Sequence, residues 1–168
     1  VSPLIALTKA QVQRLQRQGA RAKAITSGTA LREIDNALDS AAHGKLDFLY
    51  VSPERIGSEL FTARLPRMPI GLIAVDEAHC ISQWGYDFRP AYLLVGKLRE
   101  VHPQVPVLAL TASATPAVAA DIMQRLAFRK PLLLQGSFLR PELTFWASRG
   151  EDKLGRLLRI AAKLPGSG

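Results

Sequence analysis

Two adjacent acidic residues follow a short apolar stretch near the middle of the chain. Residues 72–75 are predicted to form a buried strand, and Asp76 and Glu77 come directly after it. Side chains at the carboxyl end of a parallel strand point into the crevice where α/β sheets bind ligands. An aspartate there can hold Mg²⁺ through water, and a neighbouring glutamate can orient and deprotonate an attacking water molecule. The pair therefore predicts hydrolysis at a phosphate group, the alternative being two solvated acids in a surface turn.

An aromatic-rich loop follows these acids within a few positions. Its rings alternate with polar residues and glycine, which argues against a buried strand, although Trp84 and Phe88 as core residues remain the alternative. Aromatic rings stack on nucleobases without reading sequence, at about 1–3 kcal/mol per base. An arginine can pair with phosphate or stack on a ring. We predict that the loop binds single-stranded DNA through Gln83, Trp84, Tyr86, Phe88 and Arg89.

The composition fits one domain that binds a polyanion. The chain has 168 residues, a hydrophobic fraction of 48% and a net charge of +8, and this charge favours nucleic acid through counterion release. Cys80 is the single cysteine, which excludes an internal disulfide and a thiolate zinc site and predicts a reduced, cytosolic protein. We find no signal peptide and no apolar run long enough to cross a bilayer, so no membrane partner is expected.

Strand and helix signals alternate along the chain, which predicts an α/β fold with a parallel sheet flanked by helices. Helix starts are predicted after Thr29, at Pro53 and Pro90, and at Thr115 with Pro116. Residues 136–150 are predicted to be an irregular linker before a last helix with an exposed apolar stripe. The predicted strands cover residues 21–26, 46–51, 71–75, 105–110 and 131–135.

These motifs together resemble those of a known family. Asp76-Glu77-Ala78-His79 resembles the motif II box of superfamily-two helicases, and residues 80–90 resemble the aromatic-rich loop of RecQ helicases. The family usually has histidine where Tyr86 stands and threonine where Ser113 stands. Further motifs are matched by residues 1–7 (motif Ia), 50–55 (the motif Ib region), 111–115 (motif III) and 137–141 (the segment joining the two motor lobes).

The resemblance implies a RecA-like fold and roles for individual residues. Asp76 would organise Mg²⁺ and ATP through water, and Glu77 would activate the attacking water. His79, Thr111 and Ser113 would transmit the nucleotide state to the DNA. Loops before helices have free N–H groups that bind phosphate, the alternative being turn chemistry and capping. Contacts to the DNA backbone are accordingly predicted for Ser2, Pro3, Ser52, Glu54 and Arg55.

The resemblance also implies the organisation of the chain and its activity. We expect residues 1–135 to be a partial ATP-binding lobe, residues 136–150 an interlobe linker and residues 151–168 the start of a second lobe. The intact protein would be a cytoplasmic, ATP-dependent 3′-to-5′ DNA helicase, nucleoid-associated if bacterial, acting on single-stranded and partly duplex DNA in recombination or repair. Its protein partners are left open.

The phosphate cradle expected of such an enzyme is not found in this sequence. The Walker A pattern requires glycine, four residues, then Gly-Lys-Ser or Gly-Lys-Thr, and leucine follows both Gly44-Lys45 and Gly96-Lys97. We therefore interpret the chain as a fragment that is inactive alone. Two alternatives stay open: a non-catalytic nucleic-acid-binding or interaction module from a truncated gene, and an ATPase that translocates without unwinding.

Overall fold

The computed structural model describes residues 1–163 apart from residues 86, 138–139, 145–146, 148 and 150–151. The chain divides into two compact units, Val1–Pro131 and Leu132–Gly168. The first unit holds the strands and the predicted site. In the second, the described part contains α7 (Lys153–Ala162), whose Leu154, Leu157 and Leu158 are exposed as expected from its apolar stripe.

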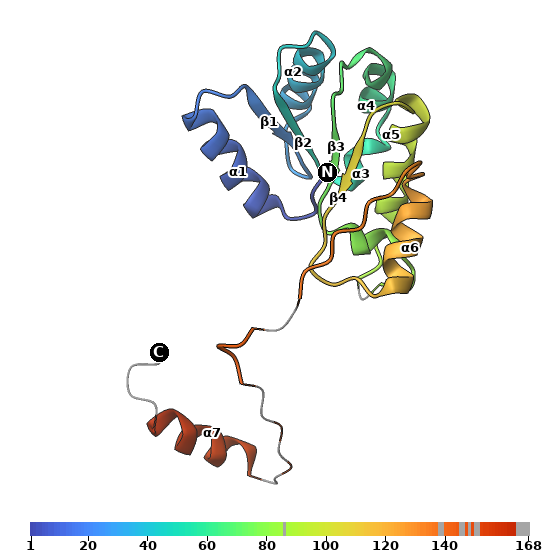
Figure 1. The fold of residues 1–168 in the computed structure, drawn as a ribbon. Helices are drawn as coiled ribbons and strands as arrows, with labels where there is room; N and C mark the ends of the chain where they lie inside the picture. The colour runs from blue at the N-terminus through green and yellow to red at the C-terminus, as the bar shows by residue number, and fades with distance from the viewer. Residues whose placement is uncertain (86, 138–139, 145–146, 148, 150–151, 164–168) are drawn as a thin grey trace. The chain divides into compact units, whose positions relative to one another are not determined.

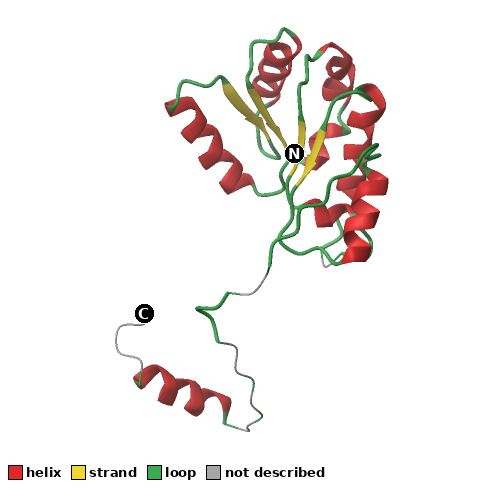
Figure 2. Ribbon diagram, in the orientation of Figure 1, coloured by secondary structure: helices red, strands yellow, loops and turns green. Residues whose placement is uncertain are grey.

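Parallel strand pairs form the centre of the first unit. β1 (Ala22–Ile25) pairs with β2 (Phe48–Val51), with Ala22 opposite Phe48. β3 (Ile73–Val75) pairs with β4 (Val107–Ala109), with Ile73 opposite Val107. Helices connect and flank these strands, as Figures 1 and 2 show. The predicted α/β class is confirmed, although each strand is shorter than predicted because the apolar run extends beyond the hydrogen-bonded ladder.

The helix that begins at Pro116 has a side-chain cap for one of its first free N–H groups. The hydroxyl of Thr115 accepts a hydrogen bond from the N–H of Val118 (3.3 Å), and Pro116 occupies the first helical position, as predicted. The helices and 3₁₀-helices of this unit are α1 (Ile5–Arg17), α2 (Leu31–Ala42), α3 (Pro53–Ile56), α4 (Glu59–Arg64), η1 (Leu65–Arg67), η2 (Ala78–Ile81), η3 (Pro90–Val95), α5 (Gly96–Val101) and α6 (Pro116–Arg125).

The core lies where the helices cover the strands. Leu38 of α2, Val75 of β3 and Leu126 after α6 are fully buried, and each such side chain contributes about 1.5–3 kcal/mol. Tyr92 of η3 is also fully buried, and its hydroxyl donates to the carbonyl oxygen of Asp76 (2.9 Å). Burial raises the pKa of this hydroxyl well above its usual range. The core thus fixes the backbone at the end of β3.

Two predictions about elements were wrong, and a third was right about where a helix starts but not about its type. Residues 131–135 form no strand, because they have no strand partner among the described residues. Thr29 does not cap α2, whose N-cap is Ala30; the Thr29 hydroxyl instead accepts from the N–H of Thr26 (3.0 Å). Pro90 starts a 3₁₀-helix, and the α-helical turn begins only at Gly96.

Candidate functional site

The backbone and neighbouring side chains fix the carboxylate of Asp76. The backbone N–H of Asp76 donates to the carbonyl oxygen of Val1 (2.9 Å), which places Asp76 at the end of β3. The hydroxyl of Ser2 donates to Oδ2 of Asp76 (3.1 Å), and the N–H of Glu77 donates to Oδ1 (3.0 Å). Both carboxylate oxygens are therefore oriented, and each keeps a further lone pair for another ligand.

Glu77 occupies a backbone conformation that non-glycine residues rarely adopt. Its φ is 48° and its ψ 44°, in the left-handed region, and it is the N-cap of η2. Such a residue costs about 1–3 kcal/mol and persists where its surroundings hold it. Here the N–H of the next residue, Ala78, donates to the carbonyl oxygen of Leu110 (2.9 Å) beside the strand pair. This turn brings the Glu77 carboxylate to 3.3 Å from Nδ1 of His79.

His79 connects the acids to the residues after β4. Its side chain is buried, with 8% of the residue exposed, and Nδ1 lies 2.9 Å from the hydroxyl of Thr111. The N–H of Ser113 donates to that same hydroxyl (3.2 Å). The structure therefore brings His79 and Thr111 together at the edge of the sheet where the paired strands β3 and β4 end. Ser113 joins them through its backbone and is otherwise exposed.

The other ring nitrogen of His79 faces the aromatic loop. Nε2 lies 3.7 Å from Sγ of Cys80, which lies 4.0 Å from Oδ2 of Asp87. Asp87 in turn accepts two hydrogen bonds from the guanidinium of Arg89 (2.7 and 3.0 Å). A continuous series of contacts thus runs from Thr111 through His79 and Cys80 to the Asp87–Arg89 ion pair.

This series also places three potential metal ligands close together, which the sequence spacing did not predict. The ligand atoms of His79, Cys80 and Asp87 lie within 4.8 Å of one another. Burial raises the pKa of the Cys80 thiol, which disfavours the thiolate that metals bind. The hydrogen bond from Arg89 lowers the pKa of the Asp87 carboxyl and occupies it. We therefore interpret the cluster as a link between the acids and the loop.

Gly85 fixes the distance between the loop and η2. A Cβ atom at this position would lie 2.5 Å from the carbonyl oxygen of His79, closer than real contacts allow. The N–H of Gly85 donates to the carbonyl oxygen of Ser82 (3.0 Å), and the N–H of Arg89 donates to that of Cys80 (2.9 Å). The sequence reasoning missed the roles of Gly85 and Cys80; a glycine between two bulky aromatic residues was the available signal.

The loop presents its indole to solvent. Trp84 is 79% exposed, so the alternative that it is a core residue is wrong. Gln83 beside it is also exposed, while Phe88 and Arg89 are half-buried. Tyr86 lies outside the described residues. An exposed indole is accessible for stacking on a base, and DNA binding by this loop stays a prediction.

The remaining predicted DNA contacts lie in different environments. Ser2 is 5% exposed and its hydroxyl is bonded to Asp76, so the structure gives that hydroxyl a role in the acid site. Ser52 is 3% exposed, and its hydroxyl finds no hydrogen-bond partner among the described residues. Nε of Arg55 donates to the carbonyl oxygen of Thr26 (3.2 Å). Pro3 is half-buried, and Glu54 is exposed.

The acidic pair fits a magnesium ion by its chemistry. Mg²⁺ is bound through one or two carboxylates together with substrate phosphates, and it keeps several waters. Asp76 and Glu77 supply carboxylate oxygens that are only partly buried, so water and phosphate can reach them. The residues present would therefore hold the ion without a dedicated cage.

Comparisons with known proteins show which family the chain is similar to. A family model described as DEAD/DEAH box helicase matches residues 1–122. The ATP-dependent DNA helicase RecQ of Bacillus subtilis is 42% identical over 154 residues, covering 91% of this chain and 26% of the relative. The ATP-dependent DNA helicase RecQ of Haemophilus influenzae is 38% identical over 160 residues, covering 95% of this chain and 26% of the relative. These matches confirm the resemblance to RecQ helicases, and the chain spans about a quarter of the length of these curated relatives.

A solved structure gives the same fold. The helicase domain of Hef from Pyrococcus furiosus aligns with a TM-score of 0.56 at 20% identity, covering 77% of this chain and 27% of that one. The likeness supports a RecA-like fold for the aligned region. Among the described residues, no helix combines the length and apolar character needed to cross a membrane.

Proposed function

Because the chain belongs to the DEAD/DEAH box helicase family, we propose that it is part of the first motor lobe of a RecQ-type, ATP-dependent 3′-to-5′ DNA helicase. The observation that carries this proposal is the series of contacts from Glu77 through His79 and Cys80 to the Asp87–Arg89 ion pair, which lies in the loop that exposes Trp84. It joins a site suited to phosphate hydrolysis to a surface suited to unpaired bases. The substrates are ATP and single-stranded or partly duplex DNA.

Asp76 and Glu77 have different roles in the proposed hydrolysis. Asp76, held by Ser2 and by the N–H of Glu77, would hold Mg²⁺ through water. The ion, when bound, neutralises charge on the phosphate oxygens. Glu77 orients the attacking water and takes its proton, and such a general base contributes about 10²- to 10⁴-fold in rate. The strained backbone of Glu77 keeps its carboxylate beside His79.

The coupling residues carry the state of this site to the DNA. His79 is buried between Thr111 on one ring nitrogen and Cys80 on the other. A shift of the imidazole therefore moves either the segment after β4 or the loop that holds Trp84. Coupling between two binding sites is reciprocal. Bases stacked on that loop would therefore in turn shift the imidazole of His79 and affect the acid site.

The activity is tested in the longer protein that contains a Walker A segment and a second lobe. We expect ATP hydrolysis to rise when an oligothymidine is added, and a duplex with a 3′ single-stranded tail to be unwound in preference to one with a 5′ tail. An ATPase that responds to the oligothymidine but separates neither duplex would identify a translocase. Equal hydrolysis with and without DNA would contradict the proposal.

A further inference from the structure

Three side chains of different chemistry converge between the acid site and the aromatic loop. The ligand atoms of His79, Cys80 and Asp87 lie within 4.8 Å of one another. Nε2 of His79 is 3.7 Å from Sγ of Cys80, and this Sγ is 4.0 Å from Oδ2 of Asp87. An imidazole, a thiolate and a carboxylate are the groups that bind Zn²⁺ in proteins. The single cysteine excludes a site built from thiolates alone, but one thiolate can combine with the other two groups.

The spacing of these three atoms is close to that of ligands around one tetrahedral ion. Zinc lies about 2.0–2.2 Å from nitrogen and oxygen ligands and about 2.3 Å from sulfur. At a tetrahedral angle, these lengths place sulfur about 3.6 Å from a nitrogen or oxygen ligand. The observed separations of 3.7 and 4.0 Å are only slightly longer. A small rotation of the Asp87 side chain would therefore close the site around an ion.

The far side of the imidazole is arranged as it is in zinc-binding histidines. A ligating histidine usually donates its other ring N–H to an oxygen acceptor such as a carboxylate, which fixes the tautomer. Nδ1 of His79 lies 3.3 Å from Oε2 of Glu77 and 2.9 Å from the hydroxyl of Thr111. A proton on Nδ1 leaves the lone pair of Nε2 free for an ion beside Cys80. His79 and Cys80 are only 8% and 1% exposed, so packing holds both donors in place.

Two groups compete with an ion for this cluster. Burial raises the pKa of the Cys80 thiol, so the sulfur carries a proton in the absence of metal. A thiol that coordinates a divalent ion loses that proton outright. Arg89 is paired with Asp87, but their side chains are 40% and 44% exposed, and ion pairs this accessible add little stability. A divalent ion can therefore displace both competitors, releasing the thiol proton to water and the guanidinium to solvent.

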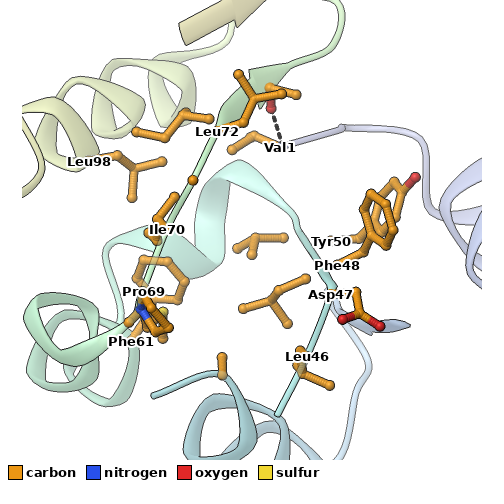
Figure 3. A pocket seen from close by; sticks show the side chains of 17 residues that line it. Val1, Leu46, Asp47, Phe48, Tyr50, Phe61, Pro69, Ile70, Leu72 and Leu98 are labelled. Carbon is orange, nitrogen blue, oxygen red and sulfur yellow. Dashed lines mark hydrogen bonds between the residues drawn. The ribbon is translucent and has the colours of Figure 1, made fainter. Parts of the chain in front are cut away.

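The cluster is open to solvent at Asp87. The side chain of this residue is partly exposed, whereas His79 and Cys80 are buried. A cavity of about 550 Å³ lies elsewhere in the first unit, lined chiefly by the mostly apolar residues 46–51 and 68–74 (Figure 3). None of the three ligand residues lines that cavity. An ion therefore reaches the cluster past the carboxylate of Asp87.

We propose that Nε2 of His79, Sγ of Cys80 and Oδ2 of Asp87 bind one thiophilic divalent cation, of which Zn²⁺ has the matching chemistry, with water in the fourth position. Mg²⁺ prefers oxygen ligands in octahedral geometry, so this site is separate from the one assigned to Asp76. The bound ion ties the aromatic loop to η2 and frees Arg89 from its ion pair. It also fixes the imidazole of His79 and would block the coupling movement, and this consequence alone rests on the proposed function.

Cobalt binding tests the site directly and needs no ATPase activity. Co²⁺ bound to a thiolate gives a sulfur-to-metal charge-transfer absorption, and Cys80 is the single cysteine of the chain. We expect this absorption to saturate at one Co²⁺ per chain and to disappear when Zn²⁺ is added. The thiol is kept reduced with a phosphine, because a thiol reductant would itself bind the ion.

Substitutions identify the ligands. Loss of an outer-shell partner weakens metal affinity about 10–100-fold, and loss of a ligand should cost at least as much. We therefore expect Asp87→Asn to raise the Kd for Co²⁺ at least about tenfold, and Cys80→Ser to abolish the charge-transfer absorption. His43→Gln is the matched control, because His43 is an exposed histidine 3.5 Å from the carboxylate of Asp39. Its Kd should equal that of the unmodified chain.

Amide hydrogen exchange, followed by NMR, reports whether the ion restrains the loop. The N–H of Arg89 donates to the carbonyl oxygen of Cys80 (2.9 Å), so it joins the loop to η2. With Zn²⁺ bound, we expect exchange at Arg89 to slow at least about tenfold, because the loop opens less often. Exchange at Ile34, whose N–H bonds to the carbonyl oxygen of Ala30 in another part of the unit, should stay the same.

Four results would overturn the proposal. The first is no charge-transfer absorption when Co²⁺ is in excess over the folded chain. The second is an unchanged Kd in Asp87→Asn, and the third is loss of binding in His43→Gln, which would identify an adventitious surface site. The fourth is unchanged exchange at Arg89 under saturating Zn²⁺. If Cys80→Ser does not fold, the absorption of the unmodified chain and the Kd of Asp87→Asn still decide.

Discussion

Replacing Glu77 with glutamine should reduce ATP hydrolysis by about 10²- to 10⁴-fold in the longer protein and leave ATP binding intact. Glutamine keeps the size of the side chain and its oxygen acceptor, but it cannot take a proton from the attacking water. The contact with Nδ1 of His79, at 3.3 Å, can persist through the amide oxygen. The experiment measures steady-state phosphate release beside equilibrium binding of a fluorescent ATP analogue.

Glu33→Gln is the matched control for this substitution. Glu33 is exposed in the first turn of α2. The Glu33→Gln variant should therefore hydrolyse ATP at the wild-type rate. If Glu77→Gln retains more than a tenth of the wild-type rate, another group supplies the base and the assignment is wrong. If it loses ATP binding to the same extent as hydrolysis, the carboxylate acts in binding and not in the chemical step.

Replacing Gly85 with alanine should uncouple DNA from hydrolysis. The new methyl group would lie 2.5 Å from the carbonyl oxygen of His79, so the loop must move away from η2. Overpacking of this kind costs about 1–3 kcal/mol. We expect DNA stimulation of the ATPase to be lost while basal hydrolysis persists. Faster amide exchange at Arg89, whose N–H bonds to the carbonyl oxygen of Cys80, would report the displacement directly.

Gly136→Ala supplies the comparison for this loop variant. A Cβ atom at Gly136 meets nothing within 4 Å, so the same chemical change should have no effect on stimulation. Full DNA stimulation in Gly85→Ala, together with unchanged exchange at Arg89, would show that the packing of the loop on His79 is not needed for coupling.

The local features of the site could be predicted from the sequence. Asp76 and Glu77 follow an apolar run, and the spacing of the loop residues made a buried strand unfavourable. The cap at Thr115 was also predictable, because Pro116 fixes the first helical position. Each of these inferences needs only residues that are near one another in the chain.

The long-range contacts could not be predicted in detail. The hydrogen bond from Ser2 to Asp76 joins residues 74 positions apart, and it depends on Val1 lying against β3. The contact of His79 with Thr111 needs the register of β3 with β4, which two short apolar runs do not define. Thr29 had two competing uses for its hydroxyl, and the turn with Thr26 was favoured over capping α2.

The placement of the Trp84 indole on an unpaired base is the claim on which the coupling depends. The chain contains two tryptophans, Trp84 and Trp146, so the variant Trp146→Phe leaves a single emitter on the loop. It is titrated with an oligothymidine, with binding followed independently by the anisotropy of a dye on the DNA. Because a stacked base quenches indole emission, we expect the fluorescence of Trp84 to fall in parallel with binding. Saturated binding with the emission of Trp84 unchanged would contradict the account.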